Sequence, residues 1–316
     1  MNKHERVRAA LAGKPVDYVP SAFWLHFPPT QAFGPEAVEA HLDFYHDTGV
    51  DILKIMNEAL YRNEGPVTSP NDWAHWKPIR AHNPHFQRLL DLVKAVSDRV
   101  GDEVPLLATI HGSFISTFHG SKRPENTIQG HNAITEHLRS TPAAVVPALR
   151  AVSETLIELS LACLEAGAHG IYYGAQGGEA HRFDETTFVD YVKPWDLMVL
   201  RELAKHTDLL VLHICKDHVR LPLYADYPCH AVNWAVHEGD YSLNDGQAIF
   251  RKTILGGLDD RSGVIVEGSD VDIQRDVTDM IRAFGKRCFI LGADCTLPTE
   301  ISRQRIRLAV DAARHA

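Results

Sequence analysis

Three side chains in two distant segments of the sequence have the types and spacing of a catalytic zinc site. His213 and Cys215 close the apolar run 209–215, whose β-forming residues predict a buried strand. Alternate side chains of a strand face the same side, so these two lie about 7 Å apart along one face. Cys295 ends a second segment of this design, 288–295, in which an apolar strand precedes a glycine turn. One nitrogen and two sulfur ligands suit a zinc ion whose fourth position is left open.

The rest of the chain is expected to form the scaffold that brings these two strand ends together. Eight segments have strand character, and most are separated by helical patterns, which predicts parallel strands joined by crossover helices. These strands are expected at 19–27, 51–56, 104–110, 170–176, 209–215, 230–236, 253–257 and 288–295. The pattern favours an α/β fold with one domain over residues 1–316, a single (β/α)8 TIM barrel with an N-terminal helical extension. An open doubly wound sheet is the alternative, although the sequence contains no Gly-rich dinucleotide motif and no P-loop.

The helical patterns alternate with these strands. They predict helices at 2–12, 36–48, 85–99, 141–166, 186–206, 242–250, 270–284 and 299–314. A polar segment at 112–132, rich in Gly, Ser and His, is long enough to be a lid or an active-site loop. We expect His119, His131 and His137, in or near this loop, to be solvated.

Polar side chains follow most of the predicted strands, where active sites of (β/α)8 barrels lie. They are His26, Asn57, Glu58, His111, Tyr173, Gln176, His213, Cys215, Asn233, His237, Glu238, Asp259, Asp294 and Cys295. Burying such groups without a partner or a purpose costs free energy. We therefore expect the active site at this end of the barrel. Its candidate catalytic residues are Glu58, His111, Tyr173, Gln176 and His237.

The cysteines also allow a purely structural interpretation. A strand cysteine is most often a small buried hydrophobe, and a lone histidine at a strand end is usually a hydrogen-bonded structural residue. Five cysteines are an odd number, unsuited to a disulfide framework, and we interpret Cys163, Cys229 and Cys288 as structural. The metal hypothesis therefore rests on the combination of the other two with one histidine. Their strands, the fifth and the eighth, end on the same rim of the barrel.

Composition and charge exclude two classes of partner. The formal net charge is −9 and no basic face is visible, which argues against nucleic acid. No apolar run approaches the ~18 residues of a membrane-spanning helix, and the N-terminus lacks the apolar segment of a signal peptide. Apolar residues make up 45% of the chain and charged residues 23%, as in ordinary globular proteins. We expect a cytoplasmic enzyme that acts on a small molecule.

Four further motifs carry a family resemblance over nearly the full length of the chain. They are Ala-Gly-Lys-Pro-Val-Asp-Tyr-Val-Pro20, Gly-Val-Asp-Ile-Leu-Lys-Ile-Met56, Ala-Gly-Ala-His-Gly-Ile-Tyr-Tyr173 and Gly-Ala-Asp-Cys-Thr-Leu-Pro298. They resemble the motifs of the uroporphyrinogen decarboxylase superfamily. Because these features are widely shared in that superfamily, the resemblance implies the fold but not the reaction.

The region after the first expected strand distinguishes two branches of that superfamily. Authentic decarboxylases carry arginines there, in a stretch of the type Arg-Gln-Ala-Gly-Arg, to hold the carboxylates of the tetrapyrrole. Residues 25–30 of this chain read Leu-His-Phe-Pro-Pro-Thr and contain no arginine. The chain is more similar to the methylcobalamin:coenzyme M methyltransferases, in which a His-x-Cys pair and a distant cysteine bind zinc. That similarity implies the same role for His213, Cys215 and Cys295.

The resemblance also implies a fourth ligand. Cobalamin-independent methionine synthase has a similar ligand arrangement with a carboxylate between the His-x-Cys pair and the late cysteine. The matching segment of this chain contains Glu238, which is the expected fourth zinc ligand. Glu58, Glu179 and His237 are the alternatives.

The activity that the resemblance implies is zinc-dependent methyl transfer to or from a thiol or a similar acceptor. The donor would be a methylcorrinoid protein, a methylated pterin or a small methyl compound. The segment from Asp43 through His46 to Gly49 is one residue too long for the corrinoid motif Asp-x-His-x-x-Gly and lies in a helical pattern. Cobalamin would therefore be supplied by a partner corrinoid protein.

Two other functions remain open from the sequence. One is a metal-independent decarboxylase that acts on a different acid, with Asp51 or His111 handling protons. The missing arginines argue against it. The other is a zinc- or corrinoid-binding barrel that serves as a partner subunit without activity of its own. The many titratable groups at strand ends argue against that function, and nothing in the sequence indicates the oligomeric state.

Overall fold

Seven parallel strands form one sheet in the computed structural model, which describes residues 1–62, 67–121 and 133–316. The strands lie side by side in chain order: β1 (Leu53–Ile55), β2 (Leu106–His111), β3 (Gly170–Ala175), β4 (Leu210–Ile214), β5 (Ala231–Trp234), β6 (Thr253–Leu258) and β7 (Phe289–Ala293). Each strand pairs in parallel with the next. Seven of the eight expected strands are confirmed, in the expected order.

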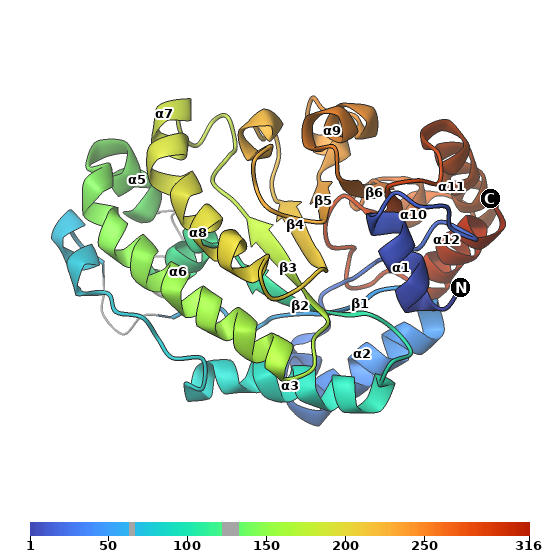
Figure 1. Cartoon of the computed structure of the whole chain (residues 1–316), viewed down its shortest axis with the longest axis horizontal. Coiled ribbons are helices and arrows are strands. Elements are labelled where there is room, and N and C mark those ends of the chain that lie inside the picture. Colours follow the sequence, from blue (N-terminus) through green and yellow to red (C-terminus); the bar gives the residue numbers. More distant parts are fainter. Residues whose placement is uncertain (63–66, 122–132) are drawn as a thin grey trace.

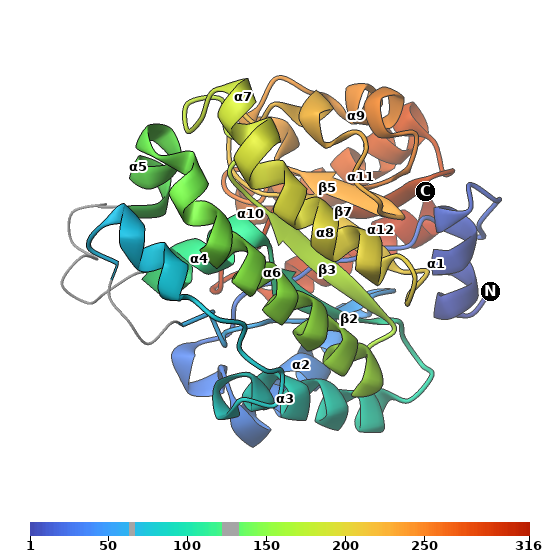
Figure 2. The same cartoon turned by 60° about the vertical axis from the view of Figure 1, so that its left-hand side comes forward.

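Helices follow most strands and surround the curled sheet (Figure 1). Both chain termini lie on the same side of the molecule (Figure 2). They are α1 (Lys3–Leu11), α2 (Gly34–Thr48), α3 (Pro84–Val100), α4 (Ser113–Ser121), α5 (Ala133–Ser140), α6 (Pro142–Glu165), α7 (Glu185–Thr187), α8 (Lys193–Leu203), α9 (Leu243–Phe250), α10 (Val264–Glu267), α11 (Asp270–Phe284) and α12 (Arg303–His315). The last helix, α12, packs against both α11 and α2, which brings the two ends of the helical layer together. No helix in the described part of the chain is long and apolar enough to cross a membrane.

Local sequence explains where several helices begin and end. Ser269 and Asp272 form a capping box at the start of α11, and Ser242 and Asp245 do the same for α9. Helix α2 ends at Gly49, whose φ of 70° lies in the left-handed region that favours glycine. These signals account for the agreement between the expected and observed boundaries of these helices.

The expected first strand, 19–27, is not a regular strand, and the eight-strand prediction is wrong in this respect. Its residues make isolated parallel bridges, Ser21 with Leu291 of β7 and Leu25 with Leu297. On the other side, the Ser21 carbonyl accepts hydrogen bonds from the N–H groups of Asp51 and Ile52, just before β1. The segment thus lies between the two edge strands of the sheet.

A buried carboxylate explains the irregularity of this segment. The N–H of Ser21 donates to Asp51 Oδ2 at 3.0 Å instead of to a strand carbonyl. Pro20, the preceding residue, has no N–H to donate. The other oxygen of Asp51 accepts from Arg6 Nη1 at 2.9 Å and from the Tyr18 hydroxyl at 3.1 Å. Asp51 therefore anchors α1 to the sheet, and the proposal that it handles protons in a decarboxylase is not supported.

Two apolar layers hold the sheet in place. The larger core lies between the strands and the surrounding helices. The smaller one gathers alternate strand residues, including Trp24, Ile52, Leu107, Tyr172, Val211, Leu255 and Ile290, together with Val7 and Ala10 of α1. Alternate residues of a strand share a face, so this second cluster marks the concave side of the sheet. Toward the carboxyl end of each strand, the next alternate residues, such as His213 after Val211, lie on this same side.

Two sequence predictions about connections need correction. The polar loop expected at 112–132 begins instead with helix α4, while residues 122–132 lie outside the described residues. The single helix expected at 186–206 is divided into α7, one π-turn at Phe188–Val192, and α8. Pro194 in the first turn of α8 has no N–H for the preceding helical ladder, which explains the interruption.

Candidate metal centre

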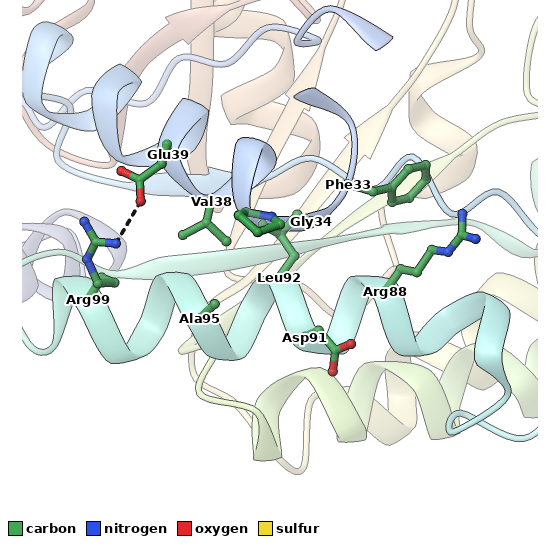
Figure 3. A pocket seen from close by; sticks show the side chains of 10 residues that line it. Phe33, Gly34, Val38, Glu39, Arg88, Asp91, Leu92, Ala95 and Arg99 are labelled. Atoms are coloured by element: carbon green, nitrogen blue, oxygen red, sulfur yellow. Dashed lines mark hydrogen bonds and ion pairs between the residues drawn. The ribbon is translucent and has the colours of Figure 1, made fainter. Parts of the chain in front are cut away.

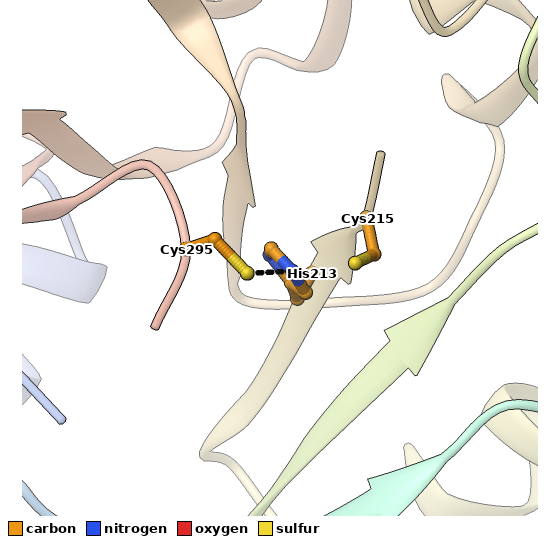
Figure 4. A group of neighbouring side chains, drawn as sticks. All are labelled: His213, Cys215 and Cys295. Atoms are coloured by element: carbon orange, nitrogen blue, oxygen red, sulfur yellow. Dashed lines mark hydrogen bonds between the residues drawn. The ribbon is translucent and has the colours of Figure 1, made fainter. Parts of the chain in front are cut away.

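The imidazole of His213 and the thiols of Cys215 and Cys295 converge at the carboxyl ends of β4 and β7 (Figure 4). Their ligand atoms all lie within 4.8 Å of one another. His213 Nε2 and Cys295 Sγ are 3.4 Å apart. The imidazole is only 4% exposed, and both thiols are partly buried. The three residues singled out from the sequence are thus brought together, although they come from strands far apart in the chain.

The geometry of the three side chains fits a tetrahedral zinc ion. Zn–N bonds of about 2.1 Å and Zn–S bonds of about 2.3 Å at a tetrahedral angle place the nitrogen and sulfur about 3.6 Å apart. The observed 3.4 Å needs only a small adjustment. No other group of three or more metal-capable side chains meets the same spacing among the described residues. The set supplies three ligands and leaves a fourth position free.

The two thiols differ in their protonation. The Cys215 side chain is hydrogen-bonded to Cys295, and this bond and the nearby His213 hold the pKa of Cys295 well below its usual range. The same hydrogen bond, together with burial, raises the pKa of Cys215. One thiolate is therefore already favoured beside the imidazole. A cation bound here would favour the second thiolate as well.

The ring of His213 is held by its neighbours on β3 and β5. Tyr172 stacks against it with ring centroids 5.3 Å apart and planes inclined by 22°. The Tyr172 hydroxyl donates to Asn233 Oδ1 at 3.3 Å, and the Asn233 amide donates to the carbonyls of Leu255 and Ala293. Asn233 thereby links β5 to β6 and β7. This network fixes the distance between the strand that carries the histidine and the strand that precedes Cys295.

The expected fourth ligand, Glu238, does not join the group. Its carboxylate forms an ion pair with Arg261 on the rim. Both residues line a cavity of about 620 Å³ together with Lys216, Asp217, His218, His237 and Gly239. Among the alternatives, Glu179 accepts from the Gly177 N–H at 2.9 Å and pairs with Arg182 at 2.7 Å. Because of these contacts, neither Glu238 nor Glu179 joins His213, Cys215 and Cys295 as a fourth ligand.

The candidate catalytic residues Glu58 and His111 belong to a second group at the mouth of the sheet. Glu58 Oε1 lies 2.6 Å from His26 Nδ1, and this contact lowers the pKa of Glu58. His111, at the end of β2, has its ring centroid 6.0 Å from that of His119. Burial, with His119 and Lys54 nearby, lowers the pKa of His111 to about 3. Glu58 is thus an ionised carboxylate and His111 a neutral imidazole near pH 7.

The candidate catalytic residue His237 is paired with a buried acid. Asp294 Oδ2 accepts from the backbone N–H of His237 at 2.7 Å and lies 2.9 Å from His237 Nδ1. This bond raises the pKa of His237. Asp260, 6% exposed, is a further acid at this rim, and burial, with Cys295 and Asp294 nearby, raises its pKa to about 7.

Tyr173, one of the candidate catalytic residues, lies away from the three converging side chains. Its hydroxyl donates to Asp196 Oδ1 at 2.5 Å and accepts from the Ser113 N–H at 3.0 Å, on the side of the helices. Tyr172, its neighbour in sequence, is the one that faces His213. Gln176 is partly exposed just after β3, and its amide makes no hydrogen bond to another described residue.

Two loop histidines are less solvated than expected. His137 Nδ1 accepts a hydrogen bond from the indole N–H of Trp73 at 2.8 Å. His119 lies on α4 against His111 and is partly buried. His131 lies outside the described residues. The sequence showed the polar character of this region but not the helix that turns these rings inward.

A larger surface groove lies away from the strand ends, between α2 and α3 (Figure 3). It has a volume of about 660 Å³ and is lined by apolar residues such as Phe33, Val38 and Leu92. Its charged side chains are engaged, since Arg99 pairs with Glu39 at 2.9 Å and Arg88 lies over the Phe33 ring. The titratable groups that could perform chemistry gather instead at the carboxyl ends of the strands.

Comparisons with known proteins agree with this fold. No curated protein matches the sequence. The structure is similar to that of a methyltransferase from Methanosarcina mazei, with 18% identity, a TM-score of 0.77, and coverage of 100% of this chain and 99% of that chain. It is also similar to a B12-independent methionine synthase from a Shewanella species, with 12% identity, a TM-score of 0.56, and coverage of 94% and 97%. At these identities the likeness concerns the fold.

A family model matched to the sequence shows the family of this chain. The family model described as uroporphyrinogen decarboxylase (URO-D) matches residues 48–316, from the end of α2 to the C-terminus. The matched region contains all seven strands and the three converging side chains. The chain therefore belongs to the uroporphyrinogen decarboxylase (URO-D) family.

Proposed function

We propose that the protein is a zinc-dependent methyltransferase that moves a methyl group between a methyl donor and a thiol. The observation that carries this proposal is the convergence of His213, Cys215 and Cys295, with ligand atoms within 4.8 Å, at the carboxyl ends of two strands. When bound there, zinc would lower the pKa of an acceptor thiol and leave its sulfur nucleophilic. Two thiolates and a neutral imidazole balance the charge of the ion, so electron density stays on the acceptor sulfur.

The surroundings support an open fourth position for the acceptor. Glu238 is paired with Arg261, Glu58 with His26, and His237 with Asp294. Glu238, Glu58 and His237 are therefore each engaged by a neighbouring side chain and do not take the fourth position on the zinc ion. Tyr172 and Asn233 would hold the imidazole of His213 in place while the acceptor sulfur approaches.

The transfer itself needs few protein groups. The acceptor sulfur forms a new S–C bond with the methyl carbon, and the bond between that carbon and the donor breaks with its electron pair left on the donor. The donor would be a methylcorrinoid protein, a methylated pterin or a small methyl compound. We include a corrinoid partner in the proposal because the chain carries no corrinoid-binding motif of its own.

A metal-independent decarboxylase is the second candidate, and membership of the URO-D family favours it. Residues 25–30, at the end of the expected first strand, lack the arginines that would hold a tetrapyrrole substrate. Asp51, one of its two candidate proton-handling groups, is occupied by Arg6, Tyr18 and Ser21. His111 is the group that remains for this chemistry. The metal centre would have no role in such a reaction, which makes metal content the deciding measurement.

The test measures zinc per chain and methyl transfer in the wild type and in three single variants. Cys215→Ser and Cys295→Ser remove ligands, while Cys288→Ser alters a partly buried cysteine outside the group and is the matched control. We expect about one zinc per chain in the wild type and the control, and little in the two ligand variants. Thiol methylation should be lost with the zinc. A folded wild type that takes up no zinc would contradict the proposal and favour the decarboxylase.

A further inference from the structure

Lys54 places a buried amine on the concave side of the sheet, against the tyrosine that stacks on His213. It lies in β1 and is 4% exposed. Its Nζ is 3.2 Å from Met56 Sδ, 4.7 Å from the ring centroid of Trp24, and 4.3 Å from that of Tyr172. It forms no ion pair within the described residues. Burying an unpaired ammonium costs free energy, so such a group needs a reason to be there.

Lys54 is connected to the proposed zinc ligand His213 through one residue, Tyr172. Tyr172, whose ring Lys54 contacts, stacks on His213. The thiolate of Cys295, followed by the carboxylate of Glu58, is the main negative group that favours the charged form of Lys54. Burial outweighs them and lowers the pKa of Lys54 to about 7. Burial favours the neutral amine and these negative groups favour the ammonium, so a change of charge at the metal centre shifts the balance between the two forms.

We propose that Lys54 takes up the proton that an acceptor thiol gives up when it binds beside His213, Cys215 and Cys295. This inference rests on the proposed function. The S–H bond of the thiol breaks with its electron pair left on sulfur, and the proton forms an N–H bond on the neutral amine. The resulting ammonium is the counter-charge for the added thiolate. Once the sulfur is methylated, the site loses that negative charge and the ammonium returns its proton to solvent.

Other titratable groups around Lys54 are less suited to this role. They are Glu58, His111, His41, Tyr172 and Asp260, from the elements that surround the amine. The pKa of Glu58 is lowered, and those of His111 and His41 fall to about 3 and 4, so none of these takes up a proton near pH 7. The pKa of Tyr172 is raised, so its hydroxyl is already protonated. Asp260, with a pKa of about 7, is the one competitor and provides the matched control.

The experiment counts protons released when 2-mercaptoethanol binds to the zinc-loaded protein. Calorimetric titrations in buffers of different ionisation enthalpy give this number directly. At about pH 8 we expect the wild type to release almost no proton, because Lys54 takes it up. At a pH below the pKa of Lys54 in the zinc-loaded protein, where the amine is already charged, the wild type should release about one proton per thiol.

Two variants at the same position separate proton uptake from charge. Lys54→Met removes both, so about one proton should be released at pH 8 and the thiol should bind about tenfold more weakly. Lys54→Arg keeps the charge but cannot take up a proton, so it should also release about one proton while binding the thiol nearly as well as the wild type. A merely structural role for the lysine would leave the proton count unchanged.

The outcomes also distinguish this inference from the proposed function. Asp260→Asn should behave as the wild type, and full proton release in that variant alone would assign the uptake to Asp260 and overturn the inference. So would a Lys54→Met protein that binds zinc and thiol and releases as few protons as the wild type. If the zinc-loaded wild type does not bind 2-mercaptoethanol at all, the proposed function fails and this inference fails with it. Zinc content and thermal unfolding of each variant show that it is folded.

Discussion

The two ends of the sheet use histidine in opposite ways. At the amino end, His169 and His230 lie just before β3 and β5, and the Nδ1 of each accepts a hydrogen bond from a backbone N–H of a neighbouring strand, that of Leu106 or Leu210. At the carboxyl end, the Nδ1 of His213 has no hydrogen-bond partner in the described residues, and its Nε2 faces the Cys295 sulfur.

This difference shows what decides the role of a histidine in this fold. At the amino end the imidazole satisfies a backbone donor that would otherwise be buried without a partner. At the carboxyl end the imidazole of His213 bonds to no backbone donor and faces the Cys295 sulfur instead, and burying a polar group without a full set of partners costs free energy. The amino end stabilises the protein, and the carboxyl end bears unsatisfied groups that suit a ligand.

The strongest test of this comparison exchanges the same residue type at the two ends. His213→Ala should weaken zinc binding by about 100-fold or more, because it removes one of only three protein ligands. His230→Ala should leave zinc binding unchanged, since its imidazole lies at the other end of the strands. Competition with a chelator measures both affinities. Equal losses in the two variants would contradict the division between the ends.

The buried charge at the carboxyl end should reduce stability in the metal-free protein. The pKa of Lys54 is about 7 in the folded state against its ordinary 10.5, so between these values the unfolded chain binds the extra proton. Stability from this group therefore rises with pH across that window and is lost below it. Lys54→Met should raise the free energy of unfolding by a few kcal/mol at about pH 6, and by little above about pH 10.5.

Urea unfolding at several pH values measures this effect, with metal removed from both proteins. Lys94→Met is the matched control, because Lys94 is exposed on α3 and pairs only with Asp98. A stability gain that does not depend on pH would indicate better packing of methionine instead of the removal of a buried charge.

The two tyrosines of β3 are consecutive and lie on opposite faces of the strand, so substituting each one compares the two faces at one position along the sheet. Tyr173→Phe should lower the free energy of unfolding by about 1–3 kcal/mol, because it leaves Asp196 Oδ1 and the Ser113 N–H with fewer partners. Tyr172→Phe loses only the longer bond to Asn233 and should cost less than about 1 kcal/mol. Denaturant unfolding of both variants checks the order, and a reversed order would contradict the assignment of the faces.

An effect of similarly small size concerns the amino end alone. His169→Ala and His230→Ala should each lower the free energy of unfolding by about 1 kcal/mol, since each removes the acceptor for one strand N–H that water can partly replace. Thermal unfolding measures the change. The two losses should add, because the histidines bond to different strands. No loss in either variant would show that these imidazoles are not structural.

Most of the fold and the convergence of His213, Cys215 and Cys295 could be predicted because both follow from short-range patterns. The alternation of strands and helices follows from the periodicity of the apolar residues. The His-x-Cys spacing places His213 and Cys215 on one face of their strand. What the sequence could not show depends on partners from distant segments. The Ser21 N–H turns to the Asp51 carboxylate, which prevents a regular first strand. Glu238 is removed from the expected ligand set by Arg261, which follows the next strand.

Two further features had a signal in the sequence. Tyr172 shares the parity of the apolar residues on the concave side, whereas Tyr173 does not, so counting alternate residues along β3 indicates which of the two faces His213. Lys54 interrupts an otherwise apolar strand. A charged residue in such a run is a reason to expect a buried partner or a function.

The position of the ligands along the chain also has a consequence for how the protein is made. His213 and Cys295 are 82 residues apart, and the first segment reaches the sheet through contacts with Leu291 and Leu297 near the other end of the chain. Contacts of such long range form slowly, because much of the chain must be ordered before they are made. During synthesis the chain must have emerged through Cys295 before the three proposed zinc ligands can come together. Zinc uptake by nascent chains would therefore report when the strands that carry these residues have assembled.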